Sequence, residues 1–161
     1  MRDCRSNAAI GYSVAADQQD AALGSDIIYD QITFQARFLH DVAHAQESVF
    51  IVSPFVTVKR VHWIEDALRI CMQQSVQVTI ITRSADSLPP SAHKVADAAI
   101  ELLTGCGASV LRQDGIHQKY AIIDGRIVWY GSINLLSFGA SQESIMRLVS
   151  SSVARALQDS K

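Results

Sequence analysis

The chain has 161 residues, of which 48% are hydrophobic and 19% are charged. This composition is typical of a globular α/β domain and excludes a wholly disordered protein. The formal net charge is −2, from 14 basic and 16 acidic residues, so no global field would attract a polyanion. Any binding of nucleic acid must therefore come from a local group of basic side chains.

Residues 1–25 are rich in Ala, Asp and Gln and predict a loosely ordered leader, followed by one domain over residues 26–161. The three cysteines show no paired spacing, which is typical of a reduced protein. No stretch approaches the roughly 18 apolar residues of a membrane span. We therefore expect a cytoplasmic protein, rather than a periplasmic or secreted one, with no stable membrane association.

From residue 32 onward the pattern alternates between helix and strand. Apolar residues at three- and four-residue steps indicate helices, and short β-rich runs indicate buried strands. The predicted helices span residues 32–46, 58–74 and 95–103, and the predicted strands span 48–52, 76–82 and 109–111. Each strand–helix–strand step is expected to be a right-handed crossover, and such crossovers build a parallel sheet.

The end of the chain predicts a different arrangement. Residues 116–123 and 126–130 are β-rich runs joined by Asp124-Gly125, the dipeptide favoured in type I′ hairpins. Residues 145–149 predict one more strand, and residues 153–158 a helical turn or two. The expected fold class is α/β, with a mixed, mainly parallel sheet flanked by helices and a C-terminal β-hairpin.

Four polar residues flank this hairpin at matched spacing. His117 and Lys119 are two apart in the predicted first strand, so their side chains share one face of the sheet. Ser132 and Asn134 are also two apart, just after the return strand. An ammonium and polar donors can hold phosphate oxygens, and an imidazole can attack phosphorus or move protons near neutral pH. These four groups therefore suit a phosphodiester substrate.

The run His-x-Lys, four residues, Asp, six residues, Gly-Ser-x-Asn, from His117 through Asp124 to Asn134, resembles the HKD motif of the phospholipase D superfamily. The strand that ends in Ser53-Pro54-Phe55 and the strand over residues 78–82 are also similar to that family's half-domain. The resemblance covers roughly residues 27–149 and implies that the hairpin carries the HKD motif of a phospholipase D-like phosphodiesterase.

The resemblance further implies a two-step reaction that needs no metal or other cofactor. His117 would attack the phosphodiester and form a phosphohistidine, while a second HKD histidine protonates the leaving oxygen and later activates water. Lys119 and Asn134, with Ser132, would bind the phosphate oxygens as negative charge develops. Glu143 lies where family members carry an acidic residue that orients the histidine ring.

The chain contains one such motif, and the other histidines start no second copy. One half-site cannot supply both the nucleophile and the acid. We therefore expect a homodimer in which two HKD faces meet across a twofold axis.

Other residues have simpler structural interpretations. Asp124 is expected to serve the turn and Gly131 the close passage of two backbones, both as structural members of the motif. His40 and His44 have a spacing that can bind metal, but no third ligand is evident and no metal site is expected.

The remaining basic and aromatic candidates are few. Trp63 and Trp129 are expected to pack in the core rather than to stack on bases. The candidates for a phosphate track beside the site are Lys59, Arg60, Lys94, Arg112 and Arg126.

By the resemblance, the leading functional hypothesis is a nuclease that cuts DNA, and also RNA, because small single-motif members of the superfamily are typically dimeric nucleases. Two alternatives stay open. One is a phosphodiesterase for phospholipid headgroups. The other is a nucleic-acid-binding or dimerisation module of a larger DNA-processing protein, such as a helicase or a restriction factor.

Overall fold

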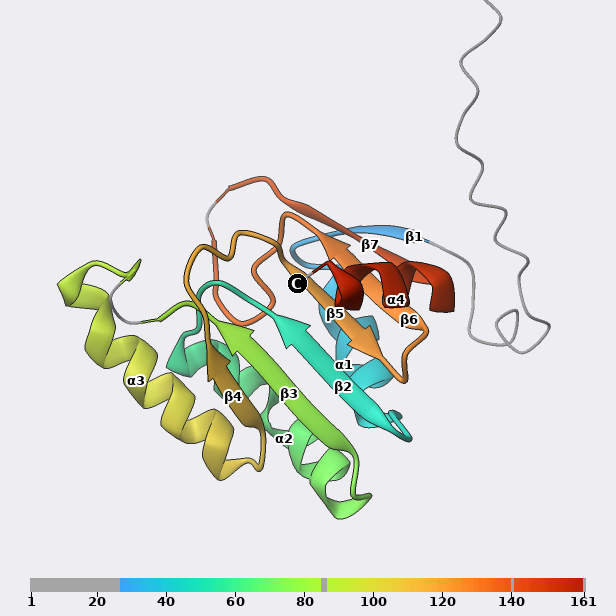
Figure 1. Ribbon diagram of the computed structural model, residues 1–161, viewed down its shortest axis with the longest axis horizontal. Helices are drawn as coiled ribbons and strands as arrows, with labels where there is room; N and C mark the ends of the chain where they lie inside the picture. The colour runs from blue at the N-terminus through green and yellow to red at the C-terminus, as the bar shows by residue number, and fades with distance from the viewer. Residues whose placement is uncertain (1–26, 85–86, 140, 161) are drawn as a thin grey trace, which may run out of the picture.

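The computed structural model describes residues 27–84, 87–139 and 141–160, so the predicted leader lies outside the described residues. The helices are α1 (Phe34–Ala43), α2 (Val58–Gln73), α3 (Pro90–Gly105) and α4 (Ser151–Asp159). The strands are β1 (Ile27–Asp30), β2 (Ser48–Val52), β3 (Gln77–Thr82), β4 (Ser109–Arg112), β5 (Tyr120–Ile123), β6 (Ile127–Gly131) and β7 (Ser144–Val149). In the described part of the chain they form one sheet in the order β1-β7-β6-β5-β2-β3-β4 (Figure 1).

The sheet is mixed, as predicted, but its parallel part is smaller than expected. Only β2–β3 and β3–β4 pair in parallel, through the crossovers that contain α2 and α3. The pairs β2–β5, β5–β6, β6–β7 and β1–β7 are antiparallel. The prediction of a mainly parallel sheet was therefore wrong in this proportion. The hairpin enters the sheet beside β2 in the opposite direction, and β1 adds an edge strand that the sequence pattern did not indicate.

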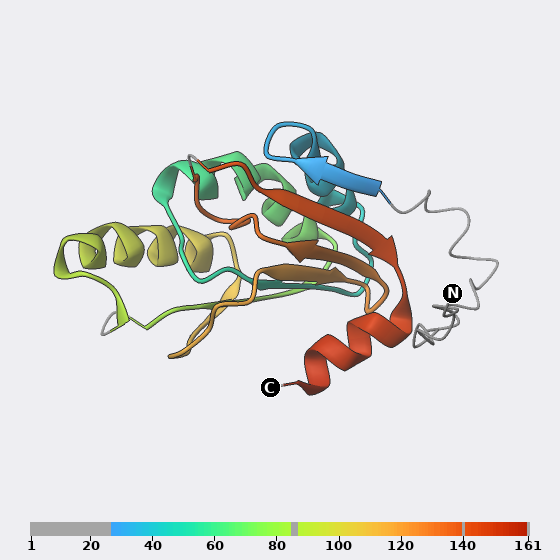
Figure 2. The same ribbon diagram turned by 90° about the horizontal axis from the view of Figure 1, so that it is seen from above.

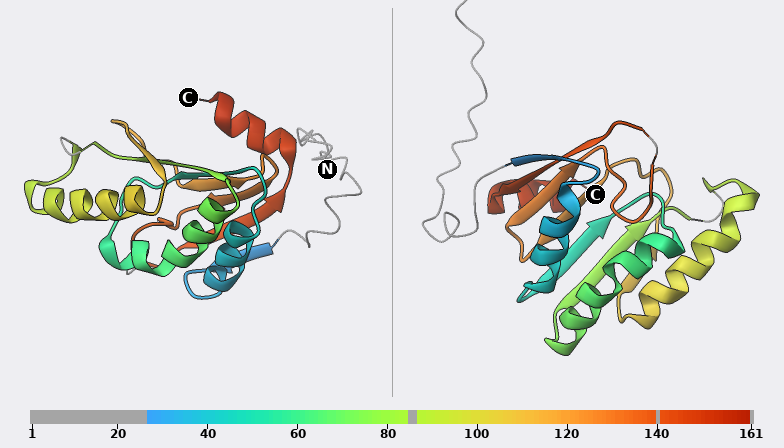
Figure 3. Two further views of the ribbon diagram at one scale, coloured as in Figure 1. Left: turned by 90° about the horizontal axis from the view of Figure 1, so that it is seen from below. Right: turned by 180° about the vertical axis from the view of Figure 1, so that it is seen from behind.

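Helices cover the two faces of the sheet unequally (Figure 2). Helices α1, α2 and α3 lie on one face, and α4 crosses the other, as the views from below and behind also show (Figure 3). The larger apolar core lies under the three helices, and a smaller one under α4 includes Val52, Ile122 and Ala154. No helix among the described residues combines the length and apolar character that crossing a membrane requires.

The hairpin turn has the geometry that its dipeptide predicts. Asp124 and Gly125 both have positive φ, 51° and 62°, as a type I′ turn requires. The first strand is shorter than expected, because β5 begins at Tyr120 rather than at residue 116. Its neighbour β2 ends at Val52, opposite Tyr120, and Pro54 beyond it has no N–H to extend the ladder. Residues 116–119 therefore lie beyond the end of the ladder between β5 and β2.

Candidate active site

His117 lies in residues 116–119, the segment that leads into β5. It is exposed, and its Nδ1 accepts a hydrogen bond from Nη2 of Arg83 at 2.8 Å. Nε of Arg83 also donates to the carbonyl oxygen of Ile116 at 3.0 Å. Arg83 directly follows β3, so the carboxyl end of a parallel strand meets the first half of the motif.

Lys119 connects the two halves of the motif. Its Nζ donates to the carbonyl oxygen of His117 at 3.0 Å, and its own carbonyl oxygen accepts from the N–H of Gly131 at 3.3 Å. This backbone bond continues the register in which Tyr120 pairs with Tyr130. His117 and Lys119 therefore lie at the same end of the hairpin as Ser132 and Asn134.

Gly131 and Ser132 are bound closely to β7. A Cβ atom at Gly131 would collide with the carbonyl oxygen of Ser144, so a larger residue would force the strands apart. The N–H of Ser132 donates to that same oxygen at 2.9 Å, and its Oγ accepts from the N–H of Ser144 at 3.1 Å. The hydroxyl of Ser132 is thus already engaged with backbone.

Asn134 opens the loop after β6, and this loop is attached to the loop after β2. Nε of Arg60 donates to the carbonyl oxygen of Leu135 at 3.0 Å, and Oγ of Ser53 accepts from the N–H of Leu136 at 3.1 Å. The N–H of Thr57 donates to the carbonyl oxygen of Leu136 at 2.8 Å. Among the described residues, no group donates to the buried Oδ1 of Asn134. A buried amide oxygen without a hydrogen-bond donor costs stability. The loop that carries Asn134 is therefore held in place while the Oδ1 atom keeps an unused acceptor.

Glu143 and His117 have different hydrogen-bond partners. Its Oε2 accepts from Nε2 of Gln31 at 2.9 Å, whereas the bond at Nδ1 of His117 comes from Arg83. The orienting role of Glu143 stays a prediction. In this structure the ring is oriented by an arginine that the motif does not contain.

A pocket of about 270 Å³ lies beside His117. Its walls come from the ends of β2 and β3, the segment before β5 and the end of α4, and they include Ile81, Asp114, Gly115, Gln118 and Ser160. Lys119 and Asn134 are not part of this lining within the described residues. The pocket therefore approaches the motif from the side of the histidine.

The opposite end of the hairpin confirms the turn geometry and adds contacts. The carboxylate of Asp124 accepts from the backbone N–H groups of Gln46, Glu47 and Ser48 at 3.0, 2.8 and 3.1 Å. It thereby ties the hairpin turn to the segment between α1 and β2. The turn lies at the opposite end of β5 from His117, so these contacts of the carboxylate are structural.

His40 and His44 stack on each other, with ring centroids 4.1 Å apart. Nδ1 of His44 is bonded to the carbonyl oxygen of His40 at 2.8 Å. Within the described part of the chain, no three His, Cys, Asp or Glu residues gather in a group that could hold a metal ion.

The two tryptophans pack internally. Trp129 is 0% exposed, and its Nε1 donates to Oδ2 of Asp41 at 3.1 Å. Trp63 stacks on Phe38 at 6.0 Å between ring centroids and lies 4.0 Å from the guanidinium of Arg60. Neither ring is a platform at the motif.

Three of the candidates for a phosphate track have contacts within the protein. Arg60 is 1% exposed and packs under the Asn134 loop, where burial lowers its pKa to about 10. Arg112 pairs with Asp97 at 2.7 Å, and Lys59 lies over the ring of Phe138 at 4.9 Å. A basic residue outside these candidates, Arg83, contacts the motif. Its position directly after a buried parallel strand was the signal that could have identified it.

The family comparison decides the assignment. Residues 38–160 match the model of the cardiolipin synthase, PLD-like domain. The chain belongs to the phospholipase D superfamily. The match includes the whole motif from His117 to Asn134 as well as Glu143. No curated protein sequence matches the chain significantly.

Solved structures agree on the fold. Nuc from Salmonella typhimurium, a phospholipase D family member, is 17% identical with a TM-score of 0.67, over 84% of this chain and 90% of that chain. NucT from Helicobacter pylori is 18% identical with a TM-score of 0.61, over 84% and 91%. A phosphatidylserine synthase from Haemophilus influenzae Rd KW20 is 11% identical with a TM-score of 0.68, over 85% of this chain but 36% of that chain.

Proposed function

We propose that this protein is a metal-independent phosphodiesterase, and that its substrate is DNA, with RNA as a second substrate. The observation that carries the proposal is the gathering of His117, Lys119 and Asn134 at one end of the hairpin in a phospholipase D fold. In this proposal His117 attacks phosphorus and forms a phosphohistidine. Lys119 and Asn134 stabilise the charge on the phosphate oxygens.

The proposal includes a homodimer, because each chain supplies one HKD histidine and the reaction uses two. Support comes from size: the fold matches about nine tenths of Nuc and NucT but about a third of the phosphatidylserine synthase. With one HKD motif in the chain, a second copy of the chain would complete a two-histidine site. We propose that the HKD faces form that interface.

The test is cleavage of supercoiled plasmid and single-stranded DNA, and of RNA, in the presence of EDTA. His117→Ala should abolish cleavage, and the control His62→Ala should leave it unchanged, because His62 is exposed on α2 and bonds to Glu65 at 2.9 Å. Cleavage by the wild type that requires Mg²⁺ would overturn the mechanism. Cleavage that survives His117→Ala would overturn the assignment of the nucleophile.

A second candidate is hydrolysis or transfer on phospholipid headgroups. It is favoured by the matching family model, which is described as cardiolipin synthase, and by the likeness to a phosphatidylserine synthase. The same variants should be assayed on phosphatidylcholine and phosphatidylglycerol vesicles. Release of headgroup, without any cleavage of nucleic acid, would select this candidate. Nucleic acid that is bound but not cut would select the binding-module alternative.

A further inference from the structure

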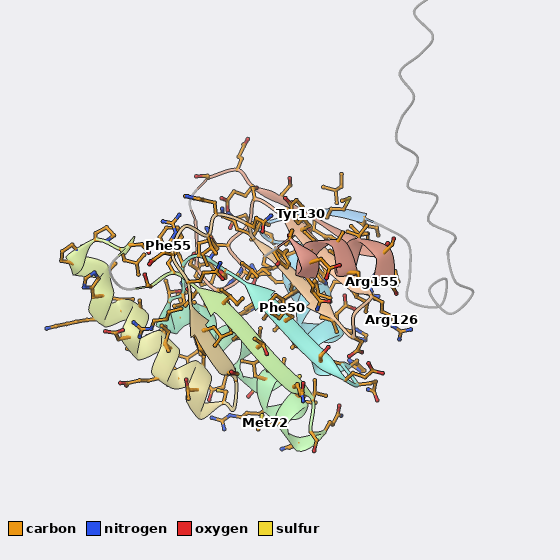
Figure 4. All side chains as sticks on the ribbon, viewed as in Figure 1. Phe50, Phe55, Met72, Arg126, Tyr130 and Arg155 are labelled. Carbon is orange, nitrogen blue, oxygen red and sulfur yellow. The ribbon has the colours of Figure 1, made fainter. Side chains whose placement is uncertain are left out.

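The guanidinium of Arg83 lies directly on the proposed nucleophile. Its Nη2 contacts Nδ1 of His117 at 2.8 Å, and its Nε is bonded to the carbonyl oxygen of Ile116 at 3.0 Å. The centroid of the Phe55 ring lies 4.9 Å from the guanidinium carbon. Figure 4 labels Phe55 at this end of the sheet. Three contacts from two segments therefore fix the position of one side chain.

The contact with His117 has one possible direction. Arginine has five N–H donors and no acceptor, so Nδ1 must accept with its lone pair. The proton of the neutral ring then resides on Nε2. In this state Nε2 has no free lone pair for attack on phosphorus, and Nδ1 cannot donate to a carboxylate. The free protein thus holds His117 in a form that cannot act as the nucleophile.

Within the described part of the chain, no acidic side chain is bonded to the guanidinium of Arg83. Its partners are an imidazole, a carbonyl oxygen and an aromatic ring, and among the described residues none of them is a carboxylate. The adjacent acidic residue, Asp114, accepts instead from the hydroxyl of Ser84. A guanidinium held next to the HKD histidine, with no carboxylate partner among the described residues, is suited to bind an anion such as a phosphate group.

We propose that Arg83 is a phosphate-binding residue that also controls the tautomer of His117. This inference rests on the proposed function, in which a phosphodiester enters the site. When the phosphate arrives, Nη2 of Arg83 leaves Nδ1 and donates to a phosphate oxygen. One proton then moves through water from Nε2 to Nδ1, and the lone pair of Nε2 becomes available to phosphorus. Substrate binding thereby prepares its own nucleophile.

The experiment measures binding of inorganic phosphate by NMR, with ¹⁵N-labelled histidine, and needs no turnover. In the wild type, saturating phosphate should shift the Nδ1 resonance of His117 strongly, because the guanidinium leaves that atom. Arg83→Ala should weaken phosphate binding about tenfold or more, the size expected for a charge-assisted hydrogen bond. Arg83→Lys, which keeps the charge but not the planar donor pair, should be intermediate.

The matched control is Arg69→Ala. Arg69 is exposed on α2, and its guanidinium is bonded to Glu65 at 2.6 Å. The control variant also loses one arginine charge, but outside the HKD motif, and should leave phosphate binding unchanged. Equal phosphate affinity in the wild type and Arg83→Ala would overturn the inference, as would an Nδ1 resonance that does not move at saturation. A protein that binds phosphate through Arg83 but cuts no DNA would lose only the proposed function.

Discussion

The two ends of the β5–β6 hairpin carry the same motif but satisfy their polar groups differently. At the turn, the carboxylate of Asp124 accepts from three backbone N–H groups. At the other end His117 is exposed, and the buried Oδ1 of Asn134 has no donor among the described residues. Arg126, close to the turn, and Phe55, near the motif, mark these ends in Figure 4. The closed end stabilises the hairpin, and the open end keeps groups ready for a ligand.

Two buried arginines repeat this contrast. Nε of Arg147, which is 1% exposed, donates to the buried Asp41 at 2.6 Å. Arg60 is equally buried, but it contacts a carbonyl oxygen and aromatic rings, and its Nη1 has no acceptor among the described residues. A paired buried charge supports the fold, whereas an unpaired one costs stability. Arg60 lies directly under the loop that holds Asn134.

The largest expected effect is at the open end. His117→Ala should lower kcat/KM at least roughly a thousandfold, because the nucleophile of the proposed mechanism is lost. Its free energy of unfolding should change by less than about 0.5 kcal/mol, since His117 is exposed. Steady-state kinetics and urea unfolding measure both quantities. A large loss of stability without a loss of activity would reverse the assignment of the two ends.

Asp41→Ala should be the most destabilising of these substitutions. It leaves the buried guanidinium of Arg147 without its carboxylate, which costs about 3–5 kcal/mol of the free energy of unfolding, and it removes the acceptor of Trp129 Nε1. Asp97→Ala breaks the exposed pair with Arg112 and should cost at most about 1 kcal/mol. Similar losses in both variants, by urea unfolding, would contradict the distinction.

Asp124→Ala should reduce the free energy of unfolding by about 2 kcal/mol. Three backbone donors lose their acceptor, and alanine is strained at a positive φ. Asp124→Asn keeps an acceptor and tolerates this conformation, so it should lose less than half as much. At temperatures where each variant is folded, kcat should stay within about twofold of the wild type. A loss of kcat in the folded Asn variant would give Asp124 a catalytic role instead.

Arg60→Met should change the free energy of unfolding by only about 1 kcal/mol or less, because the lost hydrogen bond and ring contacts are offset by the removal of a buried charge. Activity should still fall several-fold, since the carbonyl of Leu135 loses its donor and the Asn134 loop loosens. Full activity in this variant would show that Arg60 does not support the active site.

The difference in stability between the wild type and Arg60→Met should depend on pH with a defined sign. Burial lowers the pKa of Arg60 to about 10, well below the usual value of a guanidinium. The cost of burying its charge is therefore complete below pH 10 and declines in the interval above pH 10. The stability of the wild type relative to Arg60→Met should rise over that interval. Unfolding curves of both proteins measure this difference, and a relative decrease would contradict the burial of the charge.

The parts that the sequence predicted are those that depend on local patterns. The alternation around β2 and β3, the Asp124-Gly125 turn and the spacing from His117 to Asn134 each follow from neighbouring residues, so they could be read directly. The antiparallel entry of the hairpin beside β2 and the early end of the ladder at Val52 depend on tertiary pairing, which no local pattern contains.

The missed side chains have the same explanation. Arg83 is 34 residues from His117 in the chain and reaches it only because β3 ends beside the segment before β5. Arg60 was expected in a phosphate track beside the site, but the loop that follows β6 folds over it. Both arginines are brought to the motif by contacts between segments distant in sequence.

The central claim, that two chains share one active site, is tested most directly by mixing wild-type protein with His117→Ala. Equal amounts of the two proteins are unfolded and refolded together, so that subunits combine at random. DNA cleavage is then compared with that of the wild type at the same total protein concentration. If each site needs both histidines, activity follows the square of the wild-type fraction and falls to about one quarter. Activity of about one half would mean that each chain works alone and would contradict the shared site.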